Sequence, residues 1–230
     1  MSIIILVLFV LACFGIEYYH NQHKKRVIEQ NPIVRQESYQ LKQNKVFVPQ
    51  GIYLGKSHAW AYLMETGMVR VGLDDFLKHI IGKVTRITAI GNKDALKQNE
   101  VLFEVEQDNK KLTIASPITG KLRQTNPEVL NSPQKALGLP YKDRWIYELD
   151  PTNWEADTRN LFLGSSASKW MEKEFTRLKE FFAFLMSDDG SSGSYATILQ
   201  DGGEIAEKVL EYSDAETWQK FQSDFLDQSR

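Results

Sequence analysis

Residues 101–120 read VLFEVEQDNKKLTIASPITG and constrain the fold more than any other stretch of the chain. Two β-prone runs, Val101–Glu106 and Lys111–Ala115, flank the polar tip Gln107–Lys110. Apolar and polar residues alternate on both sides, and a short polar connection between such runs predicts a β-hairpin. The tip of a hairpin presents a side chain away from the packed core. The residue that stands there therefore bears on function.

Short β-rich runs separated by turn residues continue through residues 51–163, which we expect to form one domain. This spacing predicts a compact β-sandwich or barrel, and thus a mainly β fold with some helices, of the α+β class. Besides the hairpin, the expected strands are Ala59–Glu65, Met68–Leu73, Lys83–Gly91, Lys121–Gln124 and Trp145–Leu149.

Two short helices are expected within the same domain. Asp74–Ile81 places its apolar residues on one side and carries an aspartate near its start, as helix N-termini commonly do. Asn153–Leu163 is predicted to be a second helix, which closes the domain.

The charge of the chain is uneven along its 230 residues, although the net charge is only −2. Residues 1–50 are basic, residues 51–163 are balanced, and residues 164–230 carry 7 Lys and Arg against 13 Asp and Glu. We therefore expect no nucleic-acid partner. The single cysteine, Cys13, lies in an apolar run, which excludes an internal disulfide and a thiolate metal cluster.

The N-terminal run predicts a membrane anchor within residues 1–19. Ile3–Ile16 is continuously apolar, and Ser2–Tyr19 is just long enough to span a bilayer as a helix. Basic residues follow the run and none precedes it, which favours a cytoplasmic body on the inner membrane. A cleaved signal peptide or a lipoprotein site at Cys13 is the alternative. Residues 20–50 are polar and basic and read as a tether.

Several catalytic motifs can be discarded. Gly51–Ser57 imitates a phosphate-binding loop, but it has one residue too few between its glycines and leads into a β run. There is no nucleophile elbow, no His-Glu-x-x-His and no paired cysteine for zinc. His58 and His79 are too isolated in the sequence to suggest a triad. We expect no catalytic residue and no metal site.

Residues 57–163 resemble the glycine cleavage system H-protein family. No single piece is specific, but their order and spacing together are. The pieces are His58-Ala59-Trp60, Val71–Phe76 with Gly82, Val105-Glu106, Ser116-Pro117-Ile118-Thr119-Gly120, Asn126, Asn131-Ser132-Pro133, and Pro140-Tyr141 with Trp145.

This resemblance implies a barrel-sandwich hybrid, the two-sheet fold of lipoyl and biotinyl carriers. In the family a lysine at the hairpin tip carries lipoamide, which moves between the enzymes of glycine cleavage. The carrier supplies the position and its cofactor supplies the chemistry.

The acceptor position is where this sequence departs from the family. The family's spacing before the Ser-Pro exit and its spacing after Glu106 both place the acceptor at Asn109, whose amide cannot be acylated as an amine can. Lys110 is the nearest amine, but strand side chains alternate, so it should face away from the acceptor direction. Arg144 is a second departure, because the family has glycine there. We expect no cofactor, with lipoate at Lys110 as the alternative.

Residues 164–230 are predicted to form an acidic, mostly helical module that follows a hinge at Gly164–Ser168. Lys169–Met186 reads as an amphipathic helix, whose stripe packs on the rest of the protein or binds a partner. Ser213–Glu216 reads as a capping box for a last helix that carries Trp218, Phe221 and Phe225 on one face. The residues of the amphipathic stripe are Met171, Phe175, Leu178, Phe182 and Leu185, widened by Phe181 and Phe184.

Three functions remain open, none of them enzymatic. The first is a membrane-anchored, H-protein-like adaptor that has lost its lipoyl lysine and binds protein partners. The second is a working lipoyl carrier modified at Lys110. The third is a connector on the outer side of the membrane that uses Asn109–Lys111 as a contact surface.

Overall fold

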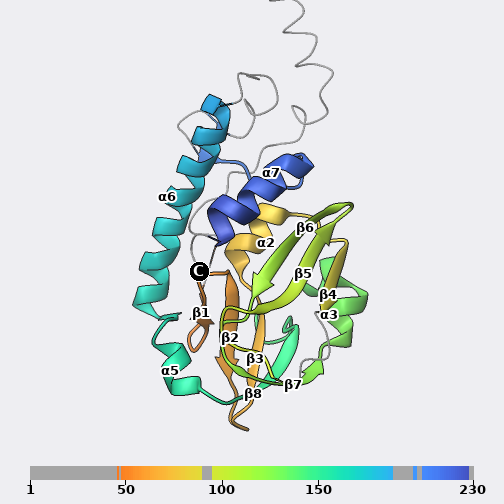
Figure 1. The fold of residues 1–230 in the computed structure, drawn as a ribbon, viewed down its shortest axis with the longest axis vertical. Coiled ribbons are helices and arrows are strands. Elements are labelled where there is room, and N and C mark those ends of the chain that lie inside the picture. Colours follow the sequence, from red (N-terminus) through yellow and green to blue (C-terminus); the bar gives the residue numbers. More distant parts are fainter. Residues whose placement is uncertain (1–45, 47, 90–94, 189–198, 201–203, 228–230) are drawn as a thin grey trace, which may run out of the picture. The chain divides into compact units, whose positions relative to one another are not determined.

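The computed structural model describes residues 46, 48–89, 95–188, 199–200 and 204–227 (Figure 1). The predicted anchor at residues 1–19 and nearly all of the predicted tether lie outside these ranges. Among the helices that the structure describes, none has the length and apolar character needed to cross a membrane.

A six-stranded antiparallel sheet forms one layer of the fold. Its strands run in the order β7-β8-β3-β2-β1-β9. In β8 buried residues alternate with half-buried ones, whereas β2 and β3 at the centre of the sheet each bury three successive residues. The strands are β1 (Tyr53–Leu54), β2 (Ala59–Leu63), β3 (Val69–Leu73), β7 (Gly120–Thr125), β8 (Tyr147–Pro151) and β9 (Phe162–Leu163).

Gly72 explains one of the sequence motifs of this sheet. It pairs across the strands with Trp60, whose indole ring is fully buried over it. A Cβ atom at position 72 would lie 2.9 Å from three atoms of that ring, so only glycine fits. The large ring and the missing side chain are therefore one packing unit.

A three-stranded antiparallel sheet contains the predicted hairpin. Its strands are β4 (Arg86–Ala89), β5 (Val101–Gln107) and β6 (Lys110–Ala115), in that order. Gln107 pairs with Lys110, and the turn between them is Asp108-Asn109, with Asp108 at a φ of 53°. Aspartate tolerates this left-handed conformation better than most residues. The hairpin and its polar tip are confirmed.

Figure 1 shows α6 along one side of the sheets, α3 beside β4 on the other, and α2 and α7 at one end. The predicted helix at Asp74–Ile81 is confirmed, and the Asp74 carboxylate accepts a hydrogen bond from Leu77 N as its N-cap. The helices are α2 (Asp75–Ile81), α3 (Pro127–Asn131), α4 (Pro133–Ala136), α5 (Trp154–Thr158), α6 (Ser165–Asp188) and α7 (Ala215–Lys220), which continues as the π-helix η3 (Phe221–Leu226). A further two-stranded pair joins β10 (Leu199–Gln200) to β11 (Glu204–Ile205).

Two of the predicted boundaries are wrong. The helix expected at Asn153–Leu163 ends at Thr158, because Phe162–Leu163 instead pairs with β1 at the edge of the large sheet. The hinge expected at Gly164–Ser168 is mostly helical, since α6 begins at Ser165. The Ser166 hydroxyl accepts a hydrogen bond from Leu163 N and donates one to Leu163 O, so this serine satisfies backbone groups at the start of the helix.

The cap of the last helix is also displaced by one residue from its predicted position. Asp214, not Ser213, is the N-cap of α7, and its carboxylate accepts a hydrogen bond from Thr217 N at 2.8 Å. The Ser213 hydroxyl instead donates to Val209 O. Trp218, Phe221 and Phe225 are buried on one face, as predicted.

One hydrophobic core runs from the sheets into the C-terminal helices. Phe175 of α6 packs edge-on against Phe76 of α2, with ring centroids 5.1 Å apart, and Phe181 packs in the same way against Phe221 at 5.7 Å. The stripe from Met171 to Leu185 is buried, which confirms that it packs within the protein. Phe184 does not belong to it, because 62% of its surface is exposed. The predicted α+β class is confirmed.

Candidate functional site

The hairpin tip is the first candidate site, because the sequence places the acceptor position there. Asn109 lies in the two-residue turn and its side chain is exposed. The preceding residue, Asp108, donates its backbone N–H to Thr85 Oγ1 at 3.1 Å, which fixes the turn against the start of β4. The structure therefore presents an amide, and no amine, at the outermost position of the hairpin.

Lys110 turns away from the exposed side of the tip and is half-buried. Its ammonium donates to the backbone carbonyls of Glu211 at 3.2 Å and Ser213 at 2.9 Å, and it lies 5.2 Å from the centroid of the Trp218 ring. Burial lowers the pKa of Lys110, and the nearby charges, beginning with Asp108, offset part of that effect. Carbonyls and an aromatic face together form a binding site for an ammonium group.

Lys111 points the other way, toward solvent. Its ammonium lies 3.2 Å from Glu106 Oε1 and 3.4 Å from Glu104 Oε2. Hydrogen bonds to these carboxylates, that of Glu106 first, raise the pKa of Lys111. The two neighbouring lysines thus differ in environment as strand alternation predicts, one captured by the C-terminal region and one ion-paired on the sheet surface.

A single C-terminal stretch, Lys208–Leu226, holds the hairpin tip, and we call it the clamp segment. It first binds the end of α2, where Lys208 N donates to His79 O at 2.7 Å and Leu210 N donates to Ile80 O at 3.0 Å. These are carbonyls of the last turn of α2, which a helix leaves without intrahelical partners. The clamp segment therefore caps the C-terminal end of α2.

Gly82 makes this close approach possible. It follows α2 with a φ of 72°, and a Cβ atom there would lie 2.7 Å from Lys208 Cβ. The next backbone N–H, of Lys83, donates to Glu211 Oε2 at 3.0 Å. Glycine is thus required both by the backbone conformation and by the neighbouring chain.

The clamp segment also binds the edge of β6. The Gln222 side chain accepts a hydrogen bond from Thr113 N at 2.8 Å and donates one to Thr113 O at 3.4 Å, as a neighbouring strand would. Trp218 Nε1 donates to Leu210 O at 2.8 Å, which joins the helical part of the clamp segment to the turns that precede it. Figure 1 shows α7 lying beside β6 and α2. Covering an edge strand in this way removes an unpaired hydrogen-bonding edge.

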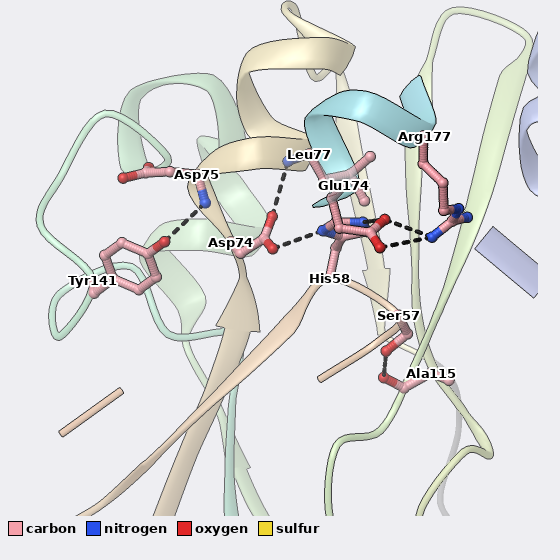
Figure 2. Close-up of polar contacts among 9 residues, drawn as sticks. All are labelled: Ser57, His58, Asp74, Asp75, Leu77, Ala115, Tyr141, Glu174 and Arg177. Carbon is pink, nitrogen blue, oxygen red and sulfur yellow. Dashed lines mark hydrogen bonds and ion pairs between the residues drawn. The ribbon is translucent and has the colours of Figure 1, made fainter. Parts of the chain in front are cut away.

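The second candidate site is a buried group of charges around His58 (Figure 2). His58 Nδ1 lies 2.8 Å from Asp74 Oδ2, and its Nε2 lies 3.5 Å from Glu174 Oε2 on α6. Glu174 in turn accepts two hydrogen bonds from Arg177 Nη1, at 2.8 and 2.6 Å. Arg177 Nη2 donates to Phe225 O in the clamp segment. A chain of charges thus connects the sheet domain to α6 and to the last helix.

The electrostatics of this group favour a charged imidazole. Burial by itself would lower the pKa of His58, but the charge of Asp74, the hydrogen bond to it and the proximity of Glu174 raise the pKa to about 9. Burial would raise the pKa of Glu174, and His58 and Arg177 lower it instead. Two cations therefore balance two anions in the interior. His58 also stacks on Phe76, with ring centroids 4.6 Å apart. Each of the four charged side chains lies next to an opposite charge, although His58 Nε2 has no hydrogen-bond partner.

Arg144, the second departure from the family, is buried at the start of α2. Its Nη1 lies 2.7 Å from Asp75 Oδ1 and donates to Leu137 O at 3.2 Å, and the guanidinium carbon lies 4.1 Å from the centroid of the Tyr141 ring. The Tyr141 hydroxyl accepts a hydrogen bond from Asp75 N. Arg144 therefore joins α2 to the end of α4.

The phosphate-loop imitation and the acidic side chains are the remaining candidates from the sequence. Gly51–Ser57 leads into β2, as expected, and the Ser57 hydroxyl donates to Ala115 O at 2.9 Å. Within the described ranges, no group of three or more His, Cys, Asp or Glu side chains is arranged to hold a metal ion.

Sequence reasoning missed the roles of Glu174 and Arg177. The pattern did contain a signal, because Glu174 lies three residues after Met171 and four before Leu178, on the apolar face of α6. A carboxylate on a buried helix face requires a partner. The contact between Lys110 and the clamp segment had no comparable signal, since it joins residues about a hundred positions apart.

Comparison with known proteins identifies the family. The sequence profile of the glycine cleavage H-protein matches residues 52–174, more than half of the chain. A probable glycine cleavage system H protein of Pyrococcus abyssi is 31% identical over 125 residues, which cover 54% of this chain and 90% of that protein. The glycine cleavage system H protein of Nitrosospira multiformis is 27% identical over 127 residues, covering 55% and 97%.

One solved structure is also similar to part of this chain. The crystal structure of a glycine cleavage system H protein from Mycobacterium marinum matches 46% of this chain and 87% of its own, at 21% identity and a TM-score of 0.42. The profile match ends at residue 174, within α6. Since that match spans more than half of its length, this chain belongs to the glycine cleavage H-protein family.

Proposed function

We propose that this protein is a non-catalytic, H-protein-like adaptor that binds protein partners and does not carry lipoate. The observation that carries the proposal is the state of the hairpin tip. Asn109, at the family's acceptor position, offers an exposed amide, while the ammonium of Lys110 is bound by the carbonyls of Glu211 and Ser213. An amide nitrogen is not the nucleophile that acylation needs, and the nearest amine, that of Lys110, is half-buried and bonded to two backbone carbonyls.

The second candidate is a lipoyl carrier modified at Lys110. One observation favours it, because burial lowers the pKa of Lys110 and so increases the fraction of neutral, nucleophilic amine. The same contacts that bury the amine occupy two of its three N–H donors. The proposal therefore assigns Lys110 to the attachment of the clamp segment and not to a cofactor.

Intact-mass measurement of the full chain, purified from lipoylation-competent cells, separates the two candidates. The adaptor function predicts the unmodified mass. Addition of one lipoyl group that is lost in Lys110→Arg, but kept in the matched variant Lys111→Arg, would establish the carrier instead. A lipoyl group that persists in both variants would contradict both readings of the hairpin.

The proposed location is the inner membrane, with a single N-terminal span at residues 2–19 and the body on the cytoplasmic side. The support is the apolar run and the basic residues that follow it. A membrane anchor suits an adaptor that gathers partners at one surface. Protease treatment of intact spheroplasts tests the orientation: protection of residues 164–230 is expected, and their cleavage from outside would favour the connector on the outer face.

A further inference from the structure

The residues directly behind the hairpin turn are shielded from solvent. Gln107 and Lys110 form the first cross-strand pair after the turn, a position that usually faces solvent at a hairpin tip. Gln107 is nevertheless only 3% exposed, and its Nε2 donates to Glu211 O at 3.3 Å, the same carbonyl that Lys110 binds. One face of the tip is therefore covered by the clamp segment.

The clamp segment is firmly attached at this position. Its large apolar side chains lie in the common core, and Arg177 and Gln222 add polar contacts at its two sides. It cannot leave the hairpin without exposing these side chains to water. The buried apolar residues of the clamp segment are Val209, Leu210, Trp218, Phe221, Phe225 and Leu226.

We propose that the clamp segment is a built-in occupant of the hairpin face, an autoinhibitory contact that excludes lysine-directed proteins from the tip. The inference deepens the proposed function and rests on it, because it explains how the tip is kept out of carrier chemistry by structure as well as by sequence. Restoring a lysine at position 109 is then insufficient to make the chain an efficient acceptor.

Acylation of the two neighbouring lysines tests the covered face without any partner protein. The full chain is treated with a water-soluble N-hydroxysuccinimide ester of acetic acid, which forms an amide at Nζ with loss of N-hydroxysuccinimide and one proton. The lowered pKa of Lys110 would make an open amine react faster than Lys111. Capture by the clamp segment predicts the reverse, at least tenfold slower acylation of Lys110, read by peptide mass spectrometry.

A variant that loosens the clamp segment but keeps its apolar anchors provides the comparison. Gln107→Ala combined with Gln222→Ala removes three hydrogen bonds between the hairpin and the clamp segment. We expect the acylation of Lys110 to rise severalfold relative to Lys111. Gln219→Ala, an exposed position on the same helix, is the matched control and should leave the ratio unchanged. Equal rates at the two lysines in the unaltered chain would overturn the inference.

The consequence for protein access is tested with Asn109→Lys in the full chain. Lipoate, ATP and a lipoate–protein ligase are supplied, with the Pyrococcus abyssi relative as the positive control. The ligase joins the lipoyl carboxylate, carried as its adenylate, to the amine and releases AMP. Less than a tenth of the control's modification rate is expected, with an increase when Gln107→Ala and Gln222→Ala are added.

Modification of Asn109→Lys at the control's rate would show that the clamp segment excludes nothing. That result leaves the proposed function intact, because the unaltered chain still lacks the acceptor. Modification of the unaltered chain would instead overturn the proposed function, so the two failures are distinguishable.

Discussion

Replacing Glu174 by glutamine removes one of the two carboxylates that face the buried imidazole of His58 while it preserves the size of the side chain. The substitution breaks the charge-assisted bonds to Arg177, now 2.8 and 2.6 Å long, and leaves His58 paired with Asp74 alone. Removing one partner of a buried ion pair costs about 3–5 kcal/mol. Arg177 is a third exposed and can be hydrated, which reduces the expected loss to about 2–3 kcal/mol.

The pH dependence gives this prediction a sign as well as a size. The pKa of His58 is about 9 in the folded protein against 6.5 unfolded, so its contribution is complete below pH 6.5 and is lost as pH rises through 9. The difference corresponds to about 3 kcal/mol. The pKa of Glu174 is lowered, so its contribution is complete above 4.5 and is lost in acid. Maximum stability is therefore expected between about pH 4.5 and 6.5.

Urea unfolding at several pH values between 5 and about 10, followed by circular dichroism, measures both effects. In Glu174→Gln the free energy of unfolding should fall at pH 6. Its decline toward alkaline pH should still begin near 6.5, the unfolded value, but should be smaller and end at a lower pH, because the pKa of His58 in the folded protein is then held up only by Asp74. Glu172→Gln, an exposed glutamate on the same helix, is the matched control. Equal unfolding free energies and equal pH profiles for the two variants would refute the proposed charge network.

Four further substitutions test the packing and the cap of the last helix. Gly72→Ala places a methyl group against the Trp60 ring and should cost about 1–3 kcal/mol, measured by urea unfolding, with an altered tryptophan emission spectrum. Phe182→Ala should cost about 3–5 kcal/mol and Phe184→Ala less than about 1 kcal/mol, because only the first ring is buried; equal losses would contradict the assigned helix face. Asp214→Ala removes the N-cap of α7 and should cost about 1 kcal/mol at pH 7 but less in acid, since the lowered pKa of Asp214 means that its contribution disappears as the carboxylate is protonated.

The sequence predicted those features that depend on neighbours along the chain. The hairpin at Val101–Gly120, the helix after Asp74 and the apolar stripe of α6 follow from alternation, capping and a period of three to four residues, which are local properties. Phe162–Leu163 was assigned to a helix because its strand character depends on pairing with Tyr53–Leu54, more than a hundred residues earlier.

The candidate site was predictable to the same extent. The position of Asn109 in the turn could be located by counting, and strand alternation predicted that Lys110 faces away from the acceptor direction. The partners of Lys110 could not be predicted, because the backbone carbonyl of any residue can accept a hydrogen bond from an ammonium group. That Glu174 has a charged partner could have been predicted, since a glutamate on a buried helix face requires one. The identity of the partner could not, because His58 lies far away in the chain.

Because the clamp segment follows the hairpin by about a hundred residues, it is synthesised well after the hairpin that it covers. Ser213 follows Lys110 by 103 positions, and Glu211 follows Lys83 by 128. At a synthesis rate of about 5–20 residues per second, the hairpin emerges roughly 5–20 s before the residues that cover it. Contacts so distant in sequence also form late in folding. An enzyme that acts on nascent chains would therefore meet an open hairpin that the finished protein no longer presents.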